Sequence, residues 1–371
     1  MNSRTRLLNT IIGKPTDRVP ISPFIWSNFV NDYFGYIVSD KELDEKCFSV
    51  YTDFDFDVML RTCNISAPND ERYLDSKSWS VEVQKKKIND KKRHEITVVK
   101  TPEKVMTQIK EFQQITEYEE VSANIKCFIE SEDDFLQFVK YQPSVPQYDC
   151  SRIKHAKEMI GDKGIIAPWT QGIFNYVSDM RKLDNLVLDM MINTQFYNNM
   201  MEYFMKRWIE ISVQYAKAGA DVLCVSGNIA TATLLGREYF EKYVLAYEKK
   251  HMSTFRSYDT YALYHNCGDA NGLYPAYNYL GIDIFESLVE PPYGDTDLDY
   301  AINVLNKDIS LIGNIDQIDF LMNASKEAVK TECKKLVNKF KNRGGFVLAT
   351  TDYLSEKTPR ENLIAMRESV S

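Results

Sequence analysis

The chain has 371 residues, of which 44% are apolar and 26% are charged, and its net charge is −8. This length suits one large domain, and the composition is ordinary for a globular protein. The acidic balance argues against non-specific nucleic-acid binding, because the phosphate backbone would be repelled. No apolar run approaches the roughly 20 residues that span a bilayer, so we expect neither nucleic acid nor a membrane as a partner.

The N-terminal third predicts a helix, a core strand and an antiparallel hairpin. Residues 3–12 place their apolar side chains on one helical face, and the apolar segment 18–26 reads as the first core strand. Residues 40–60 predict a helix followed by a strand. Residues 79–99 alternate apolar and polar side chains around a basic tip, which predicts a β-hairpin with a solvated end.

From about residue 130 the pattern alternates between helix and short apolar strand. The helical patterns cover 185–218, 237–257, 270–280, 296–305 and 325–342. The candidate strands are Gly164–Trp169, Asp221–Ser226, Tyr261–Tyr264, Ile282–Phe285, Ile309–Ile312 and Phe346–Ala349. Alternating strands and helices of this length imply parallel strands with right-handed crossovers.

Several of these strands are followed by a polar or ionisable residue that could take part in binding or catalysis. These residues are Gln171, Asn228, His265, Glu286, Asn314 and Asp352. A (β/α)8 barrel has its site on the rim where its strands end. No glycine-rich phosphate loop is present, which disfavours a doubly wound nucleotide-binding fold. We therefore predict an α/β protein, a single TIM barrel over residues 1–371 with an N-terminal β-hairpin insertion at about 76–100.

The segment His265-Asn266-Cys267-Gly268 carries the most specific chemical signal. On a strand, His265 and Cys267 would lie two residues apart and face the same side. Imidazole and thiolate are both zinc ligands. The alternative is a buried thiol beside a hydrogen-bonded histidine. The seven cysteines are scattered and odd in number, which favours reduced thiols and a cytoplasmic location.

These motifs together resemble the uroporphyrinogen decarboxylase superfamily. The resemblance rests on Ser3–Leu8, Gly13–Pro20, Gly219-Ala220-Asp221, His265–Gly268, Gly313–Asp316, Gly344-Gly345-Phe346 and Thr358–Asn362. It covers nearly the whole chain and implies a single (β/α)8 barrel. The true decarboxylases carry an arginine-rich N-terminal segment that grips carboxylates, whereas Phe24–Phe29 of this chain has no arginine. The resemblance is therefore closer to the corrinoid-dependent methyltransferase branch.

That branch implies a zinc site with a His-x-Cys pair and a third ligand, usually a cysteine after the last barrel strand. In this chain the position falls on Asp352. The resemblance therefore implies His265, Cys267 and Asp352 as metal ligands. Glu286 or Glu290 could replace Asp352, or the chain could bind metal weakly.

The implied activity is zinc-assisted methyl transfer between a small substrate and a corrinoid (cobalamin), which a partner protein would present. His265 and Glu286 are the candidate catalytic residues, Glu286 as a general acid or a further ligand, with a rim salt bridge as the alternative. Candidate substrate-binding residues are Trp26, Trp169, Gln171, Asn228 and Asn314. The aromatic residues favour an aromatic methyl ether, as in O-demethylases, or simply pack in the barrel. A porphyrinogen decarboxylase and a non-catalytic corrinoid- or tetrapyrrole-binding barrel are the alternative functions.

Overall fold

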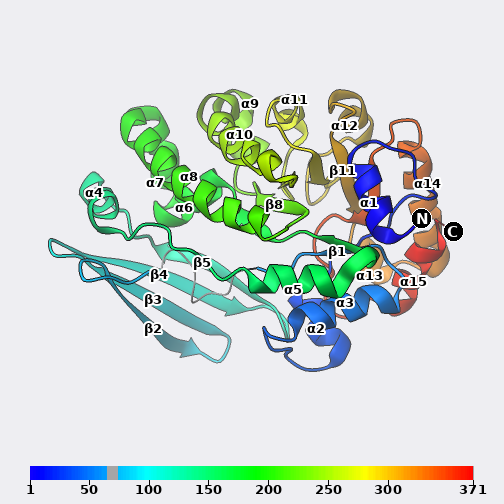
Figure 1. Cartoon of the computed structure of the whole chain (residues 1–371), viewed down its shortest axis with the longest axis horizontal. Helices are drawn as coiled ribbons and strands as arrows, with labels where there is room; N and C mark the ends of the chain where they lie inside the picture. The colour runs from blue at the N-terminus through cyan, green and yellow to red at the C-terminus, as the bar shows by residue number, and fades with distance from the viewer. Residues whose placement is uncertain (65–73, 371) are drawn as a thin grey trace.

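Parallel strands and helices alternate along the chain in the computed structural model, which describes residues 1–64 and 74–370 (Figure 1). Six strands form one parallel sheet in the order β7-β8-β9-β10-β11-β12, and β1 pairs with β6. Their bounds are β1 (Val58–Leu60), β6 (Gly164–Ile166), β7 (Trp169–Gln171), β8 (Val222–Ser226), β9 (Tyr261–His265), β10 (Ile284–Ser287), β11 (Ser310–Ile315) and β12 (Phe346–Thr350).

The segment around Ile21 joins the two ends of this arrangement. Ile21 forms a parallel bridge with Leu348 in β12, and the Asp57 amide, just before β1, donates to the Ile21 carbonyl over 2.8 Å. On the other side β6 leads directly into β7, which pairs with β8. The ring therefore runs through the Ile21 segment, β1, β6–β7, β8, β9, β10, β11 and β12. This confirms the predicted (β/α)8 barrel fold.

Helices pack around the outside of this ring (Figure 1). The predicted helix 185–218 is in fact two helices, which meet at Asn193, where the backbone leaves the helical region. Within residues 1–64 and 74–370, no helix has both the length and the apolar character needed to cross a membrane. The helices are α1 (Ser3–Ile11), α2 (Ser27–Phe34), α3 (Leu43–Asp53), α4 (Glu132–Tyr141), α5 (Ser151–Ile160), α6 (Ile173–Met180), α7 (Leu183–Ile192), α8 (Thr194–Lys217), α9 (Ala232–Tyr239), α10 (Leu245–Ser253), α11 (Tyr274–Tyr277), α12 (Leu298–Val304), α13 (Phe320–Asn323), α14 (Lys326–Phe340) and α15 (Arg360–Glu368).

The insertion is a four-stranded antiparallel sheet, larger than the predicted hairpin (Figure 1). The hairpin expected near 79–99 corresponds to β2 (Ser80–Asn89) and β3 (Lys92–Lys100). Two further strands follow, β4 (Val105–Gln114) and β5 (Glu120–Lys126). The sequence analysis missed both strands: β4 has no regular apolar alternation, and the short alternation of Val121, Ala123 and Ile125 in β5 places these side chains on an exposed face.

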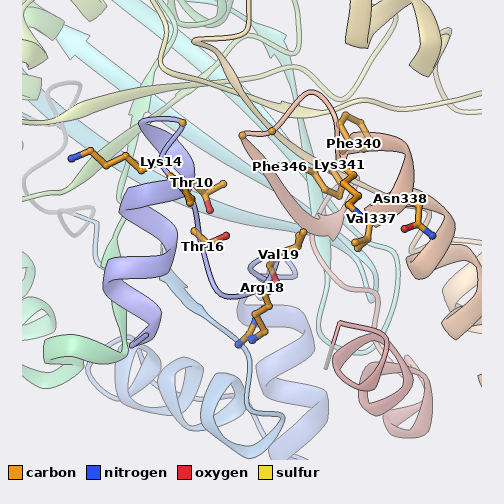
Figure 2. Close-up of a pocket in the computed structure, with 14 residues that line it drawn as sticks. Thr10, Lys14, Thr16, Arg18, Val19, Val337, Asn338, Phe340, Lys341 and Phe346 are labelled. Carbon is orange, nitrogen blue, oxygen red and sulfur yellow. Dashed lines mark hydrogen bonds between the residues drawn. The ribbon is translucent and has the colours of Figure 1, made fainter.

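The inside of the barrel is a separate apolar cluster to which most strands contribute. Side chains such as Met59, Ile165, Leu263 and Val347 meet there, and Leu7 and Ile11 of α1 pack against them. Helix α1 therefore closes the N-terminal end of the barrel. An open cavity of about 470 Å³ lies at this end between α1, α14 and the start of β12 (Figure 2). In TIM barrels this face serves stability rather than catalysis.

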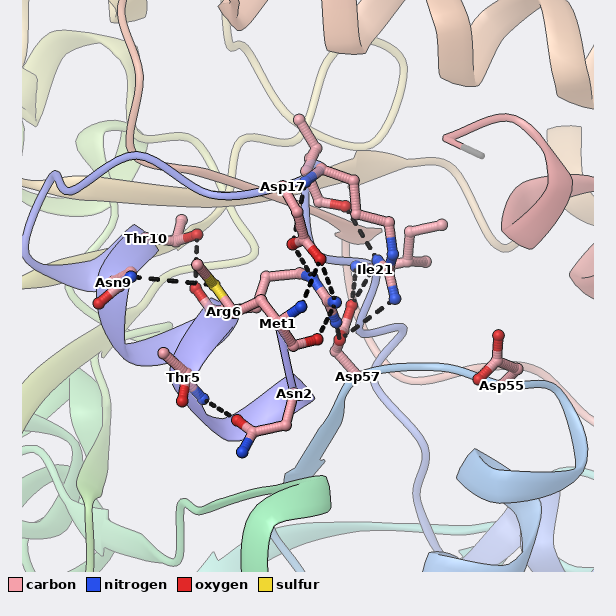
Figure 3. Close-up of polar contacts among 12 residues, drawn as sticks. Met1, Asn2, Thr5, Arg6, Asn9, Thr10, Asp17, Ile21, Asp55 and Asp57 are labelled. Carbon is pink, nitrogen blue, oxygen red and sulfur yellow. Dashed lines mark hydrogen bonds and ion pairs between the residues drawn. The ribbon is translucent and has the colours of Figure 1, made fainter.

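A buried carboxylate holds the first barrel segment in place. Asp57 is fully buried and accepts hydrogen bonds from Arg6, from Arg18 (2.7 Å) and from the backbone amide of Ile21 (2.9 Å). Arg6 also pairs with Asp17 (Figure 3). Helix α1 and the Ile21 segment are thus tied to β1 by one side chain, which explains how a segment with a single β-bridge keeps its place in the ring.

We expect Asp57→Asn to lower the free energy of unfolding by about 3–5 kcal/mol, because it takes the buried counter-charge from Arg18 and leaves Arg6 with Asp17 alone. Asp55→Asn is the matched control. Its carboxylate also pairs with an arginine, Arg367, but it is 79% exposed, and its loss should cost less than about 1 kcal/mol. Denaturant titration of both variants tests this. Equal effects would contradict the assigned role of Asp57.

Candidate functional site

Three potential ligands converge at the C-terminal end of the barrel. His265 is the last residue of β9, Cys267 follows two residues later, and Asp352 follows β12. One ligand atom from each lies within 4.8 Å of the others, and His265 Nε2 is 4.0 Å from Asp352 Oδ2. Because β9 ends at His265, Cys267 reaches this position from the loop and not from the pleat of a strand.

A buried pair of charges stands behind His265. Glu286 lies beside His265 in the register of β10 against β9, and its Oε2 is 2.8 Å from His265 Nδ1. Arg61, directly after β1, holds both carboxylate oxygens of Glu286, with Nη1 2.6 Å from Oε2. The side chains of Arg61 and Glu286 are each 1% exposed. A carboxylate that accepts from one histidine nitrogen leaves the other for a metal.

The electrostatics agree with this arrangement. Burial alone would raise the pKa of Glu286, but the charge and hydrogen bonds of Arg61 lower it to about 2. Burial alone would lower the pKa of His265, but its hydrogen bonds with Cys267 and Glu286 and the charge of Asp352 raise it to about 10. Without a metal the site therefore favours a positive charge at His265. A divalent cation could take the place of that proton.

The donor set has the chemistry of a zinc site. A nitrogen, a sulfur and a carboxylate oxygen suit zinc, and three protein ligands leave a position open, as in catalytic sites. Asp352 fits better as the third ligand than the two alternatives. Both Glu286 oxygens are held by Arg61, and Glu290 accepts a hydrogen bond from Asn314 (2.9 Å).

A cavity of about 290 Å³ opens onto this cluster. Trp169 stacks on Phe24 with their centroids 5.7 Å apart, and it meets the His265 ring edge-on at 5.3 Å. Aromatic rings thus form the wall beside the proposed ligands. The lining consists of Phe24, Trp26, Asn64, Trp169, Ser226, Asn228, His265, Asp352 and Tyr353.

The structure separates the candidate substrate-binding residues into two groups. Trp26, Trp169 and Asn228 line the cavity, whereas Gln171 and Asn314 do not. Asn314 lies inside β11, which runs on to Ile315, and its amide donates to Leu288 and Glu290. Gln171 is the exposed last residue of β7.

Sequence reasoning missed Arg61, Asn64 and Tyr353. Arg61 had a detectable signal, since it is a charged residue directly after the apolar strand β1. Asn64 and Tyr353 lie in loops, where no periodicity marks them. Asn64 accepts a hydrogen bond from the Trp169 amide (2.7 Å) and so fixes one wall of the cavity.

A (β/α)8 barrel with a cluster of His265, Cys267 and Asp352 at the C-terminal end of its strands is the architecture of a barrel enzyme. The sequence comparison then assigns the family. The family model for uroporphyrinogen decarboxylase (URO-D) matches residues 119–371. The chain therefore belongs to the uroporphyrinogen decarboxylase family.

Individual relatives are methyltransferases. A methylcobamide:CoM methyltransferase from Methanosarcina mazei is 26% identical over 165 residues, which are 43% of this chain and 45% of that protein. A methylated-thiol–coenzyme M methyltransferase from the same organism is 27% identical over 150 residues, or 40% of this chain and 37% of that protein. The chain thus aligns with less than half the length of these curated relatives.

A solved structure of a methyltransferase from Methanosarcina mazei shares the fold. It superposes with a TM-score of 0.70 and 18% sequence identity, over 100% of this chain and 98% of that one. At this level of identity the likeness confirms the barrel fold and says nothing about the substrate.

We expect about one zinc per chain in the purified wild type, and much less in Cys267→Ser and Asp352→Asn, because each variant removes a proposed ligand. Cys150→Ser is the control, since this half-buried thiol precedes α5 and lies outside the cluster. Plasma mass spectrometry of all four proteins measures the metal. Equal zinc in the wild type and in Cys267→Ser would rule out this thiolate as a ligand.

Glu286→Gln should weaken zinc binding about 10- to 100-fold, because a neutral amide holds the histidine less firmly than a carboxylate. It should also destabilise the fold by about 3–5 kcal/mol, since Arg61 loses its counter-ion. Removing both charges in Arg61→Met/Glu286→Gln should restore much of the stability and leave zinc affinity low. Recovery of both properties in the double variant would show that Glu286 serves the fold alone.

Proposed function

We propose that this protein is a zinc-dependent methyltransferase that moves a methyl group between a small substrate and a corrinoid carried by a partner protein. The observation that carries the proposal is the cluster of His265, Cys267 and Asp352, of which His265 and Asp352 line an aromatic cavity. The curated relatives support it, because both are methyltransferases and one is named for a methylcobamide.

His265, Cys267 and Asp352 would hold the zinc. The ion would supply Lewis acidity to the oxygen or sulfur that carries or receives the methyl group. Glu286 accepts the Nδ1 hydrogen of His265 and so directs Nε2 toward the other two ligands. We propose this positioning role for Glu286 in place of general acid, because a buried carboxylate with a pKa of about 2 gives no proton near neutral pH.

The cavity favours an uncharged aromatic donor, such as an aryl methyl ether. Phe24, Trp26, Trp169 and Tyr353 can pack against a ring and exclude water. The part of the lining that the structure describes contains no lysine or arginine to bind the sulfonate of coenzyme M or the carboxylates of a porphyrinogen. Arg61 lies behind Phe24, and both of its terminal nitrogens contact Glu286.

Asn228 is placed to orient an oxygen of the substrate. Its side-chain oxygen accepts a hydrogen bond from Asn175 Nδ2 (2.5 Å). That contact fixes the amide so that its own Nδ2 hydrogens remain for a substrate oxygen at the cavity wall. Loss of the Asn228 side-chain amide would impair the orientation of the methyl donor more than it would affect metal binding.

The direct test is methyl transfer between cobalamin and a set of chemically distinct substrates. With Co(I) cobalamin and an aryl methyl ether we expect the absorption of methylcobalamin to appear, at a rate at least about 100-fold lower in Cys267→Ser. Methylcobalamin with coenzyme M tests a thiol acceptor in parallel, and Cys150→Ser is again the control.

Two results would contradict the proposal. Release of carbon dioxide from uroporphyrinogen would establish the decarboxylase alternative. A zinc-loaded protein that binds cobalamin but transfers no methyl group from or to any of these substrates would favour a non-catalytic binding barrel.

A further inference from the structure

The inserted sheet reaches across to the loop that completes the site. The turn between β4 and β5 meets this loop, residues 351–359, at two points. The Tyr353 hydroxyl donates to the Glu119 carboxylate. The Glu356 carboxylate accepts from the Tyr118 amide (3.1 Å) and from the Thr116 hydroxyl. Glu356 is only 7% exposed, so this is a packed contact and not a chance meeting of surface chains.

The loop side of this contact carries the proposed third metal ligand. The Tyr353 amide donates to Asp352 Oδ1 (2.8 Å), which leaves Oδ2 as the oxygen that faces His265 Nε2. The Tyr353 ring lines the cavity and meets Phe24 edge-on, with their centroids 6.0 Å apart. One residue therefore fixes the Asp352 carboxylate through its backbone and closes the cavity wall with its side chain.

We propose that Glu119 of the inserted sheet is a positioning residue for this site, acting through Tyr353 on Asp352. Loops are the mobile parts of a barrel rim, yet a metal ligand must be held to within about 0.5 Å. Hydrogen bonds between a hydroxyl and a carboxylate are among the strong ones. The bond from Tyr353 to Glu119 fixes the ring from outside the barrel, and the ring in turn fixes the backbone beside Asp352. The inference rests on the proposed function only in taking Asp352 as a metal ligand.

The test is a measurement of the affinity for Co²⁺, in which the visible absorption of the bound ion reports binding. Glu119→Ala should raise the dissociation constant about 10-fold, as expected for the loss of a residue that supports a ligand. Glu119→Gln keeps an acceptor oxygen and should stay near the wild-type value. Glu120→Ala is the matched control, because it removes the same charge from the next residue, the first of β5, and its carboxylate pairs with Arg93 on the sheet.

A double-mutant cycle with Tyr353→Phe tests the proposed path. Tyr353→Phe breaks the same hydrogen bond, so the Glu119→Ala/Tyr353→Phe variant should bind Co²⁺ no more weakly than the weaker single variant. Additive losses would overturn the inference, as would wild-type affinity in a folded Glu119→Ala protein. Absence of Co²⁺ binding in the wild type would overturn both this inference and the proposed metal site, whereas normal binding in Glu119→Ala would overturn this inference alone.

Discussion

The site depends on a chain of charges that crosses the end of the barrel from Arg61 through Glu286 to His265. β1 and β10 lie four places apart in the ring of eight segments, so the ion pair spans the interior. Burying each ion costs several kcal/mol, and only close pairing with good geometry offsets that cost. The pair therefore requires β1, β9 and β10 to keep their register. It also determines which nitrogen of His265 faces the cavity.

The two carboxylates nearest His265 have different roles because their surroundings differ. Glu286 is buried, and both of its oxygens already accept hydrogen bonds. It can therefore orient His265 but has no free oxygen for a metal ion. Asp352 is partly exposed on a loop and keeps one oxygen directed at the cluster. A proposed metal ligand on a loop needs outside support, and the β4–β5 turn of the insertion supplies a contact to the next residue, Tyr353. The insertion thus has a physical connection to the site that its position in the sequence does not suggest.

Local patterns predicted the features that depend on neighbouring residues. Apolar runs located the strands, and the spacing of His265 and Cys267 indicated a shared ligand site. Arg61 was missed because its partner, Glu286, is 225 residues away and only the closed ring brings them together. Asn314 was expected just after a strand but lies inside β11, which extends beyond its apolar core, and its amide donates to Glu290. Strand β4 was missed because it has no regular apolar alternation, and β5 because its alternation is only three apolar residues long.

The most direct test of this account is X-ray absorption at the zinc edge of the purified protein. We predict one sulfur at about 2.3 Å and nitrogen or oxygen ligands at about 2.0–2.1 Å, from Cys267, His265, Asp352 and one exchangeable group. A first shell without sulfur, or with two sulfurs, would contradict the ligand set. A protein that retains no zinc after metal-replete purification would contradict the central claim itself.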